Sequence, residues 1–66
     1  MEIKTYRAII EINNEIITMI VKGRNRLYLK RSIIDFYKKI NMIKDEKDIQ
    51  IILVRVEYYD GDYIVV

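Results

Sequence analysis

Few side chains in this sequence can take part in covalent or acid–base chemistry. The 66 residues include no histidine, cysteine, tryptophan or proline, whereas fifteen are isoleucine. Hydrolysis by a nucleophile generally needs a Ser, Cys or Thr beside a base. The one serine, Ser32, stands where a helix is expected to begin, and the two threonines lie in apparent strands. We therefore interpret Ser32 as a helix cap and predict that the protein is not an enzyme.

Acidic residues gather in two short segments, residues 45–48 and 60–62. Both segments are expected in an exposed loop or turn, where carboxylates are poorly placed for paired acid–base catalysis. A hard cation such as Mg²⁺ or Ca²⁺ prefers oxygen ligands, but residues 45–48 lack the alternating ligands and the glycine of a calcium loop. The two glycines lie 38 residues apart and form no phosphate-binding loop. We expect no metal and no cofactor.

Basic side chains are concentrated in residues 22–31, where half of the residues are Lys or Arg. Basic groups neutralise phosphates, and an aromatic ring can stack on an unpaired base. Nucleic-acid binding is therefore our alternative hypothesis, through Lys22, Arg24, Arg26, Tyr28, Lys30 and Arg31. The simpler interpretation is a charged turn that blocks edge pairing. The net charge of +2, split into +6 over residues 1–44 and −4 over residues 45–66, is modest for a nucleic-acid-binding domain.

The elements that position these residues begin with a hairpin around Asn13 and Asn14. Both residues tolerate the positive φ of a two-residue turn. Such a turn places Ile12 opposite Glu15, and the alternation of side chains then gives the hairpin one apolar face. That face is predicted to be core and contains Tyr6, Ala8, Ile10, Ile12, Ile17, Met19 and Val21.

A second hairpin is predicted around Asp60 and Gly61, because this dipeptide is a strong turn signal between Tyr- and Val-rich runs. The pairing places Tyr58 opposite Tyr63 and Val56 opposite Val65. Ile52 and Val54 then continue the same face, which we predict to be core. Tyr59 points the other way and is expected to be an exposed anchor at an interface.

A helix is predicted over about residues 32–43, between the two hairpins. Ser32 and Asp35 suit its first turn, and apolar residues recur at helical spacing at Ile33, Phe36, Tyr37, Ile40 and Ile43. The preceding residues 26–30 alternate polar and apolar, which favours a short strand. They alternatively form the first turns of a helix that begins near residue 27.

The predicted fold is therefore α+β: one domain over residues 1–66, with an antiparallel sheet of four or five strands and one helix packed on one face. A single helix leaves the reverse face of the sheet uncovered. That face carries apolar residues among polar ones, and an exposed apolar patch marks an interface. The predicted interface residues are Ile9, Ile16, Ile20, Ile51 and Leu53.

A chain of this length buries a small core, and such domains often gain stability from a disulfide, a metal or a partner subunit. Without cysteine or histidine, very good packing or oligomerisation remains. We expect a protein-binding domain that forms a homodimer, and its composition also suits a viral or plasmid accessory protein that modulates a host protein. No segment is apolar enough to span a membrane, and the lack of cysteine fits the cytoplasm.

Overall fold

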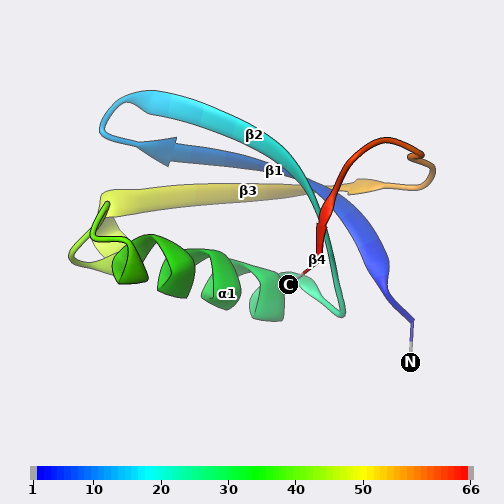
Figure 1. The fold of residues 1–66 in the computed structure, drawn as a ribbon, viewed down its shortest axis with the longest axis horizontal. Helices are drawn as coiled ribbons and strands as arrows, with labels where there is room; N and C mark the ends of the chain where they lie inside the picture. The colour runs from blue at the N-terminus through cyan, green and yellow to red at the C-terminus, as the bar shows by residue number, and fades with distance from the viewer. Residues whose placement is uncertain (1, 66) are drawn as a thin grey trace.

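The computed structural model describes residues 2–65 and contains one helix against one face of a twisted sheet (Figure 1). The strands are β1 (Lys4–Ile12), β2 (Glu15–Gly23), β3 (Ile49–Val56) and β4 (Ile64–Val65). The helix α1 (Arg26–Lys39) follows β2, and a short 3-10 helix, η1 (Glu46–Asp48), precedes β3. The strand order is β3-β1-β2-β4. The α+β class with a single covering helix is confirmed.

The first hairpin has the predicted turn and register. Asn13 and Asn14 have φ angles of 53° and 66°, in the left-handed region that asparagine tolerates. Ile12 pairs with Glu15, and the pairing of β1 with β2 continues from there without a bulge. The predicted apolar face of this hairpin lies against α1, so local turn chemistry and alternation were sufficient for this part of the fold.

The predicted second hairpin is wrong. β3 pairs antiparallel with β1, whereas the two residues of β4 pair in parallel with Val21 and Lys22 at the opposite edge of the sheet. The antiparallel sheet therefore has three strands, not four or five. Residues 57–63 form a loop that crosses from β3 to β4, with Asp60 and Gly61 inside it. β1 is the central strand of these three, and its backbone pairs with β2 along one edge and with β3 along the other.

The helix begins and ends earlier than predicted. The side chain of Asn25 caps it by accepting the Tyr28 backbone N–H at 2.8 Å, so Ser32 lies inside the helix and residues 26–30 are helical. The strand favoured for residues 26–30 is therefore wrong and the alternative start is correct. The helix ends at Lys39, because Asn41 takes a left-handed φ of 62° and turns the chain back toward β3.

The core lies between α1 and the sheet. Leu29, Ile33 and Tyr37 form the buried stripe of the helix, at a spacing of four residues. Gly23 lets the side chain of Leu29 on α1 pack directly against the backbone of β2, since a Cβ built at Gly23 would lie 2.5 Å from Cδ2 of the fully buried Leu29. The other buried apolar residues are Tyr6, Ala8, Ile10, Ile12, Val21, Ile43, Ile49 and Leu53.

Candidate functional site

The sheet face turned away from α1 is the candidate functional site, and we call it the open face. Within the described part of the chain no helix covers it (Figure 1). The strand register and the alternation of side chains define its members. They are Thr5, Arg7, Ile9 and Glu11 of β1, Ile16, Thr18, Ile20 and Lys22 of β2, and Gln50, Ile52, Val54 and Val56 of β3.

Apolar side chains on the open face are left in contact with solvent. Ile16 is 69% exposed, Ile52 59% and Val54 46%, while Ile9 and Ile20 are half-buried by their neighbours. Ile52, Ile9 and Thr18 form one row across the three strands. Solvated faces of antiparallel sheets are usually polar, and this face departs from that pattern.

Two of the predicted interface residues lie on the other side of the sheet. Ile51 pairs with Ile10 and Leu53 with Ala8, so both share the face packed on α1, and Leu53 is only 8% exposed. Our prediction exchanged the two sides of β3, because it relied on the second hairpin, which does not form. Ile52 and Val54, predicted to be core, are the β3 residues of the open face. Ile9, Ile16 and Ile20 lie where they were predicted.

The open face carries two opposite charges on its central strand. Arg7 lies between Val54 and Ile20, and Glu11 lies between Gln50 and Ile16. Four residues of extended chain separate them by about 13 Å, too far for an ion pair within one sheet. Among residues 2–65 the one ion pair is elsewhere, at 3.6 Å between Arg31 and Glu46.

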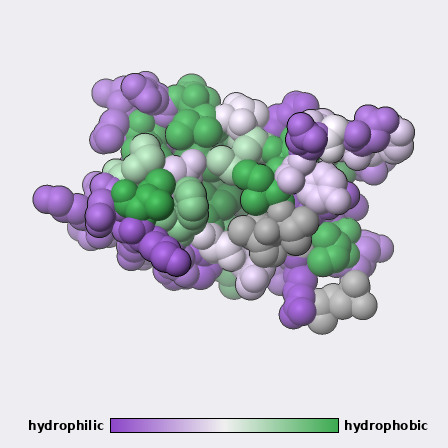
Figure 2. Space-filling model, viewed as in Figure 1, coloured by the Kyte–Doolittle hydropathy of each residue, from purple (hydrophilic) through white to green (hydrophobic). Residues whose placement is uncertain are grey.

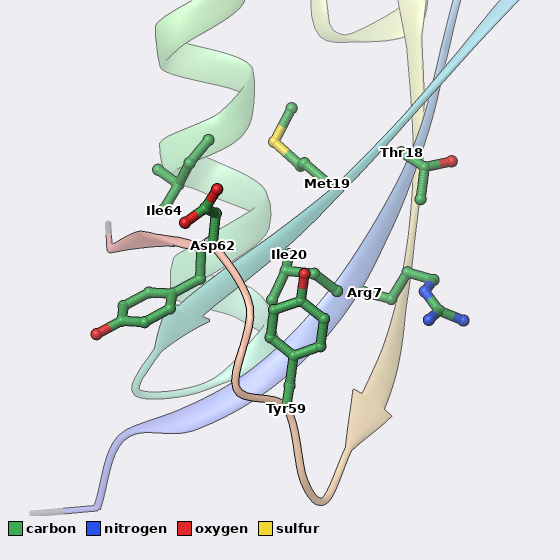
Figure 3. Close-up of a pocket in the computed structure, with 8 residues that line it drawn as sticks. Arg7, Thr18, Met19, Ile20, Tyr59, Asp62 and Ile64 are labelled. Atoms are coloured by element: carbon green, nitrogen blue, oxygen red, sulfur yellow. The ribbon is translucent and has the colours of Figure 1, made fainter.

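A cavity of about 440 Å³ lies where the loop of residues 57–63 meets the open face (Figure 3). On the sheet side it is bounded by Arg7, Thr18 and Ile20, and on the loop side by Tyr59 and Asp62. The cavity continues around the β2 edge to Met19, Tyr63 and Ile64. Tyr59, expected to be an interface anchor, therefore forms part of a wall at one end of the open face.

The predicted nucleic-acid-binding residues do not all lie on one surface. In a helix each residue turns by about 100°, so Arg26 and Lys30 share one side of α1 and Tyr28 lies nearly opposite them. Arg26 lies over the ring of Tyr6, with 5.3 Å between its Cζ and the ring centroid. Lys22 lies over another ring, with its Nζ 3.9 Å from the centroid of Tyr63. A strand at residues 26–30 would have placed Arg26, Tyr28 and Lys30 on one side, but these residues are helical.

The acidic segment before β3 has a structural role. Asp48 Oδ2 accepts the backbone N–H groups of Lys44 and Asp45, at 3.2 and 3.1 Å. Asp45 in turn accepts from the Lys47 N–H at 3.2 Å, which completes a capping box for η1. Among residues 2–65 no three His, Cys, Asp or Glu side chains group so as to hold a metal ion.

A second apolar surface lies between α1 and β2. A groove of about 150 Å³ is lined there by Phe36 and Ile33 of the helix, Met19 and Val21 of β2, and Ile64 of β4. Figure 2 shows apolar side chains on the surface between the helix and the strands. Phe36 and Ile64 are the half-exposed side chains of the groove.

No helix among the described residues has the length and hydropathy needed to cross a bilayer. Comparison with protein-family models, with curated proteins and with solved structures finds no match to this chain. The geometry of the open face therefore carries the functional interpretation by itself. Sequence reasoning missed Ile52 and Val54. Each side of β3 has three apolar residues and one polar residue, so the pattern of this strand holds no signal that could have found them.

Proposed function

We propose that this protein is a non-enzymatic protein-binding domain that acts through the open face. The single observation that carries the proposal is the exposure of Ile16, Ile52 and Val54 on a sheet face that no described element covers. Removing apolar surface from water contributes roughly 25 cal/mol per Å². Covering these side chains therefore supplies a driving force for association that a polar sheet face would lack.

The occupant that suits this face best is a second copy of the chain. A domain of 66 residues has a small core, and it has no cysteine to form a disulfide and no histidine to help hold a metal. Binding that involves only the folded state adds stability by mass action. A homodimer thus covers the open face and stabilises the domain at the same time. The lack of cysteine also supports a reducing compartment such as the cytoplasm.

The size of the face sets the strength expected of such a dimer. Three strands of about nine residues make a surface of roughly 30 by 14 Å. Two copies together would bury on the order of 1,000 Å², which is the lower end for a specific complex. We therefore expect a reversible dimer whose dissociation constant lies in the micromolar range or above.

Sedimentation velocity over a concentration series, from about 1 µM to 1 mM, tests the proposal. The expected result is a shift from 8.0 kDa toward twice that mass as the concentration rises. Ile52→Lys should hold the protein in the 8.0 kDa form. Leu27→Lys is the matched control, because Leu27 is 80% exposed on α1, away from the open face. A dimer that survives Ile52→Lys and is lost with Leu27→Lys would overturn the proposal.

A further inference from the structure

We infer that the two copies pack open face to open face about a two-fold axis that runs across the strands over Ile9. The inference rests on the proposed function and specifies the geometry of that interface. Such an axis lies between the two sheets and turns β1 onto β1 of the second copy in the opposite direction. The residue two positions before Ile9 in one copy then faces the residue two positions after Ile9 in the second copy.

The charges of β1 select this axis. It places Arg7 over Glu11 of the second copy, and the symmetry makes that contact twice. The alternative axis, along the strands, would place Arg7 over Arg7 and Glu11 over Glu11. Like charges facing each other across an interface are strongly unfavourable. Sheets pack about 10 Å apart, a distance that Arg and Glu side chains extended toward each other can span.

The isoleucines of β2 on the open face favour the same axis for a separate reason. Ile16 and Ile20 lie two residues on either side of Thr18, which pairs with Ile9. The axis therefore brings Ile16, the most exposed isoleucine of the open face, opposite Ile20 of the second copy. Ile20 and Tyr59 both border the cavity at this end of the open face (Figure 3). Each copy thus offers one projecting isoleucine and one cavity that can receive it.

The loop of residues 57–63 gives a third reason. It rises from the end of β3 on the side of the sheet away from α1 (Figure 1) and borders the open face at its Arg7 end. An axis along the strands would set the two loops against each other and hold the sheets apart. An axis across the strands sets each loop beside the Asn13–Asn14 turn of the other copy, beyond the apolar rows. The central row of Ile52 and Ile9 then packs against the same row of the second copy.

Charge reversal tests this geometry with the full chain. We expect Arg7→Glu and Glu11→Arg each to weaken the dimer about tenfold or more, since each places like charges together. The double variant restores opposite charges and should dimerise to within a few fold of the unchanged protein. An equimolar mixture of the two single variants should form heterodimers, detectable by native mass spectrometry. Lys30→Glu, on α1, is the control for the change in net charge made by Arg7→Glu.

The outcomes separate this inference from the proposed function. If both single variants and the double variant dimerise like the unchanged protein while Ile52→Lys is monomeric, the open face is the interface and the axis is wrong. If the unchanged protein is monomeric at 1 mM, both are wrong. Circular dichroism of every variant establishes that it is folded. Loss in both singles with recovery in the double is the result that the inference requires.

Discussion

The side-chain oxygen of Asn25 accepts the backbone N–H of Tyr28 at 2.8 Å, and this bond sets the start of α1. It satisfies one of the donors that a helix N-terminus leaves without a partner. No acidic residue lies in the first turn, where Arg26 is unfavourable beside the positive helix end. The cap is therefore the main local stabilisation of this end of the helix.

Asn25→Ala should lower the free energy of unfolding by about 1 kcal/mol. Asn25→Asp keeps the acceptor and adds a favourable charge at the helix N-terminus, so it should leave stability equal or slightly higher. Urea unfolding followed by circular dichroism measures both, at a concentration low enough to keep the protein monomeric. Equal stability of the Ala and Asp variants would show that the cap contributes nothing.

Gly23→Ala should destabilise the monomer by about 1–3 kcal/mol, because the new methyl group overpacks against the buried Leu29. Gly61→Ala is the matched control. Its Cβ would also meet a side chain at 2.5 Å, but that contact is with the hydroxyl end of Tyr59, which lies at the surface and not in the core. The control should change the free energy of unfolding little. Similar losses from both substitutions would contradict the close packing of Gly23 on Leu29.

Neighbouring residues of β3 should respond in opposite ways to truncation. Leu53→Ala removes a buried side chain and should cost about 2–5 kcal/mol of monomer stability. Ile52→Ala removes an exposed one and should cost well under that, but it should weaken the dimer. Thermal unfolding and sedimentation of the two variants measure both effects. If Ile52 proved the more costly of the two in the monomer, the face assignment of β3 would be inverted.

Nucleic-acid binding should be weak, because the predicted residues are divided: Tyr28 lies on the side of α1 opposite Lys30, and Lys22 lies on β2. We expect no electrophoretic shift of DNA or RNA at about 150 mM salt. Any binding at about 50 mM should fall steeply with added salt. Retention at 150 mM that is lost with a double Arg24→Ala and Arg26→Ala variant would favour the nucleic-acid hypothesis instead.

The sequence was sufficient for the part of the fold that local interactions determine. Asn13 and Asn14 carry their own turn conformation, so the first hairpin and its core face were predictable. The uncovered face followed from the single helix, and with it Ile9, Ile16 and Ile20. The helix start was left open, because residues 26–30 alternate like a strand while Leu29, Ile33 and Tyr37 repeat like a helix.

The failures come from contacts between distant residues. Asp60 and Gly61 have the composition of a hairpin turn, yet β3 pairs with β1, more than thirty-five residues away along the chain. A local turn signal carries no information about that competition. Because both sides of β3 contain apolar residues, its sequence did not decide which side faces α1, and Ile51 and Leu53 were assigned to the wrong face.

Methyl NMR on dilution tests the central claim most directly, since fifteen isoleucines report from both faces of the sheet and from α1. If the open face binds a second copy, the δ1 methyl signals of Ile9, Ile16, Ile20 and Ile52 should shift together as the concentration falls. Those of Ile33 and Ile40 on the helix side should stay in place. Shifts confined to Ile33 and Ile64, which line the groove between α1 and β2, or no shift at any isoleucine up to 1 mM, would contradict the assignment of the open face as the binding surface.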